Sequence, residues 1–252
     1  MIKLFIYFGI FLINLSCGES NLGLAGTNPP SHTSFNTLLK KHVSDQGKVD
    51  YKGFIADEEK LDAYLQLLST NAPDRNTWSE AEQLAYWINA YNAFTIKLIL
   101  NHYPVKSIKD IGPKLTIPLV NTVWHLEFFE IGGKPASLDE IEHKILRKEF
   151  DEPRIHFAIN CASISCPRLW NHAYSAKNLD AELEQAARTF INDPQLNKTT
   201  GSQVEISSLF SWFSSDFTKN GSLEDFINQY ATNPIKKGAK ISFKDYNWAL
   251  NE

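Results

Sequence analysis

Residues 86–100 read YWINAYNAFTIKLIL, and this stretch decides how the rest of the chain is arranged. It belongs to a predicted helix that begins near residues 77–79 and ends at about His102. No charge occurs between Glu82 and Lys97, and apolar side chains point all round the helix. Because a helix that is apolar all round is buried on every side, the pattern predicts a central helix around which the other elements pack.

Two amides interrupt this apolar helix. Asn89 and Asn92 lie one turn apart, on one face of the helix. A buried amide without hydrogen-bond partners costs about 1–3 kcal/mol. We therefore expect both amides to be paired, either by bridging neighbouring loops or by lining a site, and the sequence leaves these two alternatives open.

The remaining patterns predict a helix-rich α+β domain over residues 35–252, in which a small antiparallel sheet packs on the buried central helix. The predicted helices are 35–43, 57–68, 138–149, 180–192, the short aromatic 210–217 and one that begins after Ser222. The predicted strands and extended pieces are 47–51, 123–131 with a return at 134–136, 155–160, 203–206 and 240–248.

Composition excludes several classes of protein. The 252 residues are 43% hydrophobic and 12% aromatic, and they include 12 Gly and 11 Pro, which excludes disordered and collagen-like chains. Three Cys are too few for a disulfide-stapled scaffold. The net charge is −4 and no long basic run occurs, so we expect no nucleic-acid partner and no general affinity for anionic membranes.

The N-terminus is typical of an exported lipoprotein. Lys3 precedes an apolar run too short to cross a bilayer, which predicts a signal peptide over 1–16. Residues 15–18 (LSCG) resemble a bacterial lipobox, in which Cys17 would become the lipidated first residue. Residues 17–34 then form a flexible tether. We expect a periplasmic or outer-membrane location with a lipid anchor as the membrane contact; the alternative is ordinary cleavage near Ser16.

Cys161 is the candidate nucleophile. It follows the predicted strand 155–160, and His156 lies five residues before it. Because side chains alternate along a strand, a direct contact between the two needs a bend at Asn160. The adjacent Glu142-His143 pair is a possible accessory site, since a nucleophilic thiol needs a base. The opposing hypothesis is a Cys that only packs in the core.

Cys161 and Cys166 also form a possible redox pair. In an exported protein they could form a disulfide, although redox motifs usually have the C-x-x-C spacing. Together with His156 they could offer three zinc ligands, but the spacing fits no zinc pattern. Phosphate-loop, dinucleotide and serine-hydrolase motifs are absent from the sequence, so we expect neither a metal nor an organic cofactor.

Four segments resemble the domain of unknown function 547 family: YWINAYNAFTIKLIL (86–100), SLDEIEHKILRKEF (137–150), RIHFAINCASISCPRL (154–169) and SLFSWFSSDF (208–217). The resemblance spans about residues 35–220, and the VDY at 49–51 agrees with it. The family includes exported bacterial proteins and plant proteins joined to other modules. The resemblance implies no established activity, although a thiol-redox role has been attached to some members.

A more distant resemblance links residues 89–93 to the central helix of transglutaminase-like and papain-like folds. In those folds a catalytic Cys begins the helix and a His follows on a strand. Here Asn89 would take the position of that Cys, and residues 155–157 would form the His strand. An amide cannot act as the nucleophile. The resemblance therefore implies either a degenerate binding pocket or a site in which Cys161 replaces the thiol.

Three functional hypotheses follow. The first is an envelope hydrolase or acyltransferase for amides or thioesters, with Cys161 as nucleophile, His156 as base, and Asn89 or Asn92 orienting the imidazole. The second is a non-catalytic lipoprotein that binds an envelope peptide, glycan or lipid through Trp170, Trp212 and Trp248. The third is thiol–disulfide exchange. For the first we predict that buried His156 hydrogen-bonds to Asn89 or Asn92.

Overall fold

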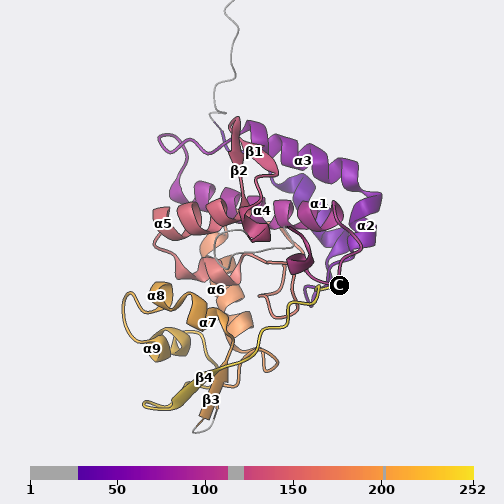
Figure 1. Ribbon diagram of the computed structural model, residues 1–252. Helices are drawn as coiled ribbons and strands as arrows, with labels where there is room; N and C mark the ends of the chain where they lie inside the picture. Colours follow the sequence, from indigo (N-terminus) through magenta and orange to yellow (C-terminus); the bar gives the residue numbers. More distant parts are fainter. Residues whose placement is uncertain (1–27, 113–121, 201–202) are drawn as a thin grey trace, which may run out of the picture.

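The computed structural model describes residues 28–112, 122–200 and 203–252, and its centre is helix α4, Glu80–Leu100 (Figure 1). The helix begins at a capping box, in which the Ser79 hydroxyl accepts from the Glu82 N–H and the Glu82 carboxylate accepts from the Ser79 N–H. From Leu84 to Leu100 almost every side chain is buried. The central buried helix predicted from the sequence is confirmed.

Three helices precede α4 in the upper part of Figure 1: α1 (Thr33–His42), α2 (Tyr51–Ala56) and α3 (Glu58–Thr70). Helices α2 and α3 pack on α4, and α1 packs on α2 and α3. Helices α1 and α3 correspond to predicted helices. Helix α2 is an addition to the prediction, which made Tyr51 extended and assigned no element to residues 52–56. The Asp50 carboxylate accepts from the Gly53 N–H at 2.9 Å and so starts the short helix.

A β-hairpin packs on the central helix, as the sequence predicts. Strands β1 (Phe129–Ile131) and β2 (Lys134–Ala136) pair antiparallel around the turn at 132–133. The Phe129 ring stacks on Phe94 of α4 with 3.8 Å between ring centroids. The predicted strand 123–131 is shorter than expected, because its beginning forms a 3-10 turn, η2 (Val123–His125). Another 3-10 turn, η1 (Ile108–Asp110), precedes it.

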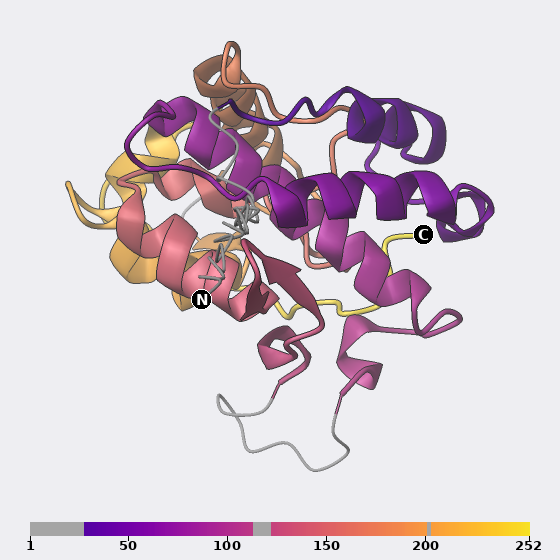
Figure 2. The ribbon, with the colours of Figure 1, turned by 90° about the horizontal axis from the view of Figure 1, so that it is seen from above.

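The helix predicted over 138–149 begins as a π-helix, η3 (Glu140–Leu146), and continues as α5 (Arg147–Glu149). It crosses beside α4 (Figure 2). Before the π-helix, the Ser137 hydroxyl accepts from the Glu140 N–H at 3.2 Å. The wider π turn brings the Glu142, His143 and Arg147 side chains to one cavity.

The C-terminal part of the chain, in the lower part of Figure 1, contributes most of a second apolar cluster, which also includes Phe157. Its strands β3 (Gln203–Ile206) and β4 (Lys240–Phe243) pair in parallel. Its helices are α6 (Leu179–Ile191), α7 (Leu209–Trp212), α8 (Ser214–Phe217) and α9 (Leu223–Asn228). A capping box at Ser222 opens α9. The fold is therefore helix-rich α+β, and the parallel pairing of β3 with β4 is an addition to the prediction.

The strand predicted over 155–160 is wrong. Residues Pro153–Phe157 form a 3-10 helix, η4, followed by an irregular segment. The reason is visible in the burial: Ile155, Ala158 and Ile159 enter the main core at helical spacing, whereas Phe157 enters the second cluster. An apolar run that is buried on both sides fits a strand and a helical turn equally well. The His strand implied by the transglutaminase-like resemblance is absent at these residues.

The two amides of α4 bridge neighbouring loops, which is one of the two alternatives that the sequence left open. Asn89 donates to the Tyr174 carbonyl at 2.8 Å and accepts from the Tyr174 N–H at 3.0 Å. Asn92 donates to the Ala158 carbonyl at 3.0 Å and accepts from the Asn160 N–H at 2.8 Å. Each amide thus pairs with the backbone of a crossing segment in the way a neighbouring strand would.

We predict that Asn92→Ala lowers the free energy of unfolding by about 2–4 kcal/mol, because it leaves a buried carbonyl and a buried N–H unpaired. Urea unfolding of the full chain measures this difference. Asn101→Ala, the same change at an exposed position at the end of α4, is the control and should alter stability by less than about 0.5 kcal/mol. Equal effects of the two substitutions would contradict the clamping role of Asn92.

Candidate functional site

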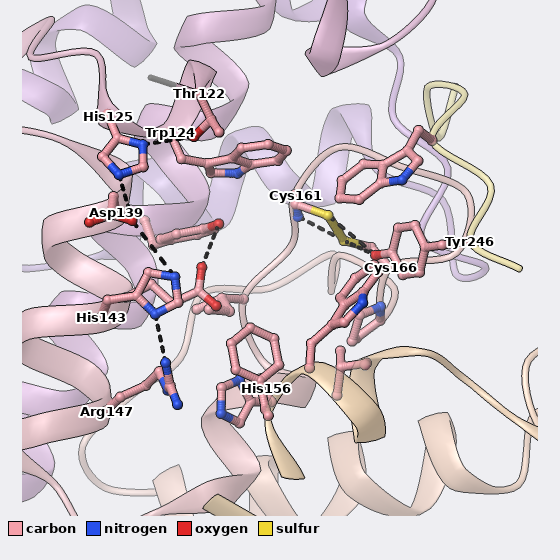
Figure 3. Close-up of a pocket in the computed structure, with 18 residues that line it drawn as sticks. Thr122, Trp124, His125, Asp139, His143, Arg147, His156, Cys161, Cys166 and Tyr246 are labelled. Atoms are coloured by element: carbon pink, nitrogen blue, oxygen red, sulfur yellow. Dashed lines mark hydrogen bonds and ion pairs between the residues drawn. A yellow bond between two sulfur atoms is a disulfide. The ribbon is translucent and has the colours of Figure 1, made fainter. Parts of the chain in front are cut away.

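A cavity of about 640 Å³ lies where η3, α7, the 161–167 loop and the C-terminal segment meet (Figure 3). Its walls are largely apolar and include six Tyr, Trp and Phe side chains. The lining residues include Tyr91, Trp124, His125, Asp139, Glu142, His143, Arg147, His156, Cys161, Cys166, Trp212, Phe213, Tyr246 and Trp248. In the view of Figure 3, the two cysteines and Tyr246 face the His125, Asp139 and His143 side chains across the cavity.

Cys161 and Cys166 form a disulfide in the wall of this cavity. Cys161 is half-buried, whereas Cys166 is buried. Asn160 shapes the loop that carries them: its side chain donates to the Pro167 carbonyl at 2.7 Å and accepts from the Ala162 N–H at 2.8 Å. Ala162 adopts a left-handed φ of 58°, a conformation that L-residues seldom adopt. The sharp turn at Ala162 is thus built into the loop between the two sulfurs.

Polar groups surround the sulfur of Cys166. The Cys161 N–H donates to it at 2.9 Å, and the Tyr246 hydroxyl donates to it at 3.2 Å. Ser163 is buried, and its hydroxyl donates to the Tyr246 oxygen at 3.3 Å. Burial raises the pKa of Tyr246, so this hydroxyl keeps its proton. Cys166 therefore has two hydrogen-bond donors aimed at its sulfur.

His156 is held by Asp216 rather than by an amide of α4. Its Nε2 lies 2.8 Å from Asp216 Oδ2, and its ring stacks on Phe213 with 4.0 Å between centroids. Arg147 donates to the two oxygens of the same carboxylate, at 2.6 and 3.0 Å. Burial alone would raise the pKa of Asp216, but the hydrogen bonds from His156 and Arg147 outweigh it and lower that pKa. Burial lowers the pKa of His156.

Arg147 also fixes the protonation of His143. Its Nη1 lies 2.8 Å from Nδ1 of His143, and because a guanidinium carries only donors, Nδ1 must accept. The imidazole is then neutral, with its proton on Nε2, which lies 3.7 Å from Asp139. Burial lowers the pKa of His143, in agreement with the neutral form.

Glu142 is a buried carboxyl group of the cavity whose pKa is shifted toward neutrality. Its carboxylate accepts from the Tyr91 hydroxyl at 3.2 Å, and the side chain is 9% exposed. Burial raises the pKa of Glu142 to about 7, and the hydrogen bond from Tyr91 opposes the shift only in part. Glu142 can therefore take up or release a proton at neutral pH.

Nε2 of His125 and of His143 both face Asp139 Oδ1, at 3.5 and 3.7 Å. The proton on Nε2 of His143 removes the lone pair that a metal would need. No cluster of three or more His, Cys, Asp or Glu in the described ranges has an arrangement that could hold a metal ion.

Four aromatic rings form one rim of the cavity. Tyr246 lies 4.7 Å from Trp212 and 4.5 Å from Trp248, and Trp124 contacts Trp248 at 5.5 Å between centroids. Trp212 is 49% exposed. Of the three tryptophans expected to contact a ligand, Trp212 and Trp248 line this cavity, whereas Trp170 packs under the Arg168 guanidinium in another part of the molecule.

Residues 75–191 match the family model described as "Protein of unknown function, DUF547". This chain contains a DUF547 domain. The matched range includes α4, η3 and the disulfide loop, so the DUF547 domain supplies the two cysteines, His143, Arg147 and His156. No curated protein and no solved structure matches the chain.

Outside the DUF547 match, the C-terminal residues Trp212, Asp216 and Tyr246 complete the site. The sequence alone assigned no roles to Asp216, Tyr246 or Arg147. Asp216 lies in the quoted SLFSWFSSDF motif and Arg147 in SLDEIEHKILRKEF, which was the available signal. Nothing in the sequence around Tyr246 marks it.

The predicted hydrogen bond from His156 to Asn89 or Asn92 is wrong. The amides are taken by Tyr174, Ala158 and Asn160, and neither amide is part of the cavity wall. His156, Cys161, Glu142 and His143 do line one cavity. Cys17, the signal peptide 1–16 and most of the tether lie outside the described residues. No helix in the described part of the chain has an apolar stretch long enough to span a membrane.

The raised pKa of Glu142 generates a prediction on stability. Its usual value is 4.5, and in the folded protein it is about 7. Between these values the folded protein holds a proton that the unfolded chain has released, so stability falls as the pH rises through this window. Glu142→Gln keeps the Tyr91 contact without the charge.

At about pH 8, Glu142→Gln should raise the free energy of unfolding by up to about 3 kcal/mol, and at about pH 4 it should have little effect. Urea unfolding at the two pH values gives the comparison. Glu140→Gln, a half-buried neighbour on the same turn, serves as the control and should lack this pH dependence. A pH-independent effect of Glu142→Gln would show that the carboxyl titrates at its ordinary value.

Proposed function

We propose that this chain carries out thiol–disulfide exchange at Cys161–Cys166, with thiols that enter the cavity. The observation that carries the proposal is the placement of the disulfide: it forms part of a cavity wall, Cys161 is the more exposed of its two residues, and two donors face the Cys166 sulfur. Disulfides with only a structural role are usually shielded from thiols, whereas exchange requires access to one sulfur.

The order of steps follows from access. A substrate thiolate attacks Cys161 Sγ, the bond to Cys166 breaks, and a mixed disulfide forms on Cys161. A second substrate thiol then attacks the mixed disulfide and releases the oxidised substrate. Glu142 lines the same cavity with a pKa of about 7, which suits it to accept the proton of an incoming thiol.

Exchange fits the geometry better than the hydrolase hypothesis. A hydrolase would need Cys161 as a free thiolate with an imidazole beside it. The hydrogen-bonding groups near the Cys161 sulfur are instead the hydroxyls of Ser163 and Tyr246, each at 3.4 Å. His156 directs Nε2 at Asp216, and its Nδ1 is buried without a partner in the described residues.

The cavity walls favour thiols with apolar neighbours. Trp124, Trp212, Phe213 and Trp248 line the cavity, and the guanidinium of Arg147, also in the wall, is paired with Asp216. A cysteine within a peptide of the cell envelope is a substrate of this kind. An exported location would also supply the oxidising surroundings in which disulfides persist.

Export and lipidation at Cys17 lead to one prediction. Intact-mass analysis of the protein from a bacterial envelope should give a chain that begins at Cys17 and carries acyl groups, and Cys17→Ser should remove the acyl mass and release the protein from membranes. Ser20→Ala, a change in the tether that leaves the lipobox intact, is the control. An unmodified chain that begins elsewhere would contradict the proposed anchor.

Exchange at Cys161 leads to another prediction. With glutathione disulfide as the probe, the full-length Cys166→Ser variant should form a stable glutathione adduct on Cys161, because the resolving thiol is missing. Cys161→Ser is the matched control: the buried Cys166 should react at least about tenfold more slowly. Both variants are made in a Cys17→Ser background, and adducts are counted by mass spectrometry.

The reduced Cys17→Ser protein itself should end without an adduct, since Cys166 displaces the bound glutathione and restores the disulfide. Failure of Cys166→Ser to form the adduct, or a stable adduct on the protein with both cysteines, would overturn the proposal. Loss of a measured envelope hydrolase activity in His156→Gln, with exchange unchanged, would instead revive the hydrolase hypothesis.

A further inference from the structure

The groups around the disulfide distinguish its two sulfurs. Cys161 is half-buried and lies at the cavity, so an incoming thiolate reaches it first. Cys166 is 6% exposed, and its sulfur becomes the leaving group when Cys161 is attacked. The surroundings of Cys166 therefore decide how readily the disulfide opens.

Two donors, one N–H and one O–H, already face the Cys166 sulfur in the disulfide. One is the backbone N–H of Cys161 at 2.9 Å, and the other is the Tyr246 hydroxyl at 3.2 Å. The Ser163 hydroxyl, at 3.3 Å, donates to the Tyr246 oxygen and leaves the tyrosine proton free for sulfur. The Tyr246 oxygen is nearer to the Cys166 sulfur, at 3.2 Å, than to the Cys161 sulfur, at 3.4 Å. A neutral disulfide sulfur is a weak acceptor, whereas a thiolate accepts charge-assisted bonds that are about twice as strong.

We propose that this pair acts as an oxidant of thiols, in which Tyr246 is the positioning residue that stabilises the Cys166 thiolate of the reduced form. The inference rests on the proposed exchange function and gives it a direction: the substrate is a reduced thiol or dithiol. Stabilising the reduced form of a dithiol makes its disulfide more oxidising.

The reaction balances as follows. A substrate dithiol loses two electrons and two protons and becomes a disulfide; the Cys161–Cys166 bond takes up the two electrons and breaks. One proton goes to Cys161 as its thiol, and the other goes to solvent or to Glu142, while Cys166 remains a thiolate. A further turnover requires an external disulfide, of a small molecule or of a protein, to re-oxidise the pair.

The test is the equilibrium between this pair and glutathione. The full chain in the Cys17→Ser background is mixed with reduced and oxidised glutathione, quenched with acid and analysed by mass for free thiols. We expect the wild-type pair to oxidise reduced glutathione. Tyr246→Phe should lower the equilibrium constant for reduction of the disulfide about tenfold. For a two-electron couple this corresponds to a fall of about 30 mV in its reduction potential.

Two further variants make the result specific. Tyr174→Phe removes a buried hydroxyl that has no hydrogen-bond partner in the described structure and lies outside the cavity. This control should leave the equilibrium constant for reduction of the disulfide unchanged. Ser163→Ala removes the bond that orients Tyr246 and should lower the constant by a smaller factor. This variant also serves if Tyr246→Phe does not fold.

A second readout is the thiolate absorbance of Cys166 in the Cys161→Ser variant, followed as a function of pH. The fraction of Cys166 that is ionised should fall about tenfold, at a pH below its pKa, when Tyr246→Phe is added to this variant. A purely structural Tyr246 would leave the titration of Cys166 unchanged.

The outcomes separate the inference from the proposed function. Suppose that the Cys161–Cys166 disulfide exchanges with glutathione but stays oxidised in a glutathione buffer at the redox potential of an oxidising compartment. This result would overturn the oxidant role alone. Equal constants for wild type and Tyr246→Phe would overturn the role of Tyr246. A pair that exchanges with no thiol at all would overturn the proposed function itself.

Discussion

The side-chain amide of Asn92 holds the segment that carries Cys161 against the buried helix α4, and the rest of the site depends on this clamp. Its two bonds fix the Ala158 carbonyl and the Asn160 N–H. Asn160 is then placed to bond Ala162 and Pro167, which sets the shape of the disulfide loop. A site built in this way inherits the rigidity of the most buried helix in the described chain.

The charges of the cavity are arranged around Arg147. The Arg147 guanidinium donates to His143 and so holds that imidazole neutral. It also pairs with Asp216, and the Asp216 carboxylate, which binds His156, therefore stays ionised. Buried charges are tolerated when they are paired in this way. Glu142, whose pKa is raised to about 7 by burial, lines the same cavity as the disulfide, and this supports the proposed transfer of a proton from an incoming thiol.

The sequence predicted the parts of the fold that local patterns specify. The buried central helix α4, the helix that begins after Ser222 and the hairpin that returns at 134–136 are all confirmed. Residues 155–160 were misassigned because an apolar run buried against two clusters has no distinct period. Cys161, Glu142 and His156 could be named from their motifs. Tyr246 could not, since it reaches Cys166 from 80 residues away along the chain.

The central claim is that the fold exposes and activates the Cys161–Cys166 disulfide for attack by thiols. The most direct measurement is its rate of reduction by dithiothreitol in the native protein, compared with the same chain unfolded in urea. Our account predicts that the native disulfide reacts faster, because Cys161 is accessible and donors stabilise the departing Cys166 thiolate. Slower reduction in the native protein than in the unfolded chain would show that the disulfide is a shielded structural bond, and would contradict the account.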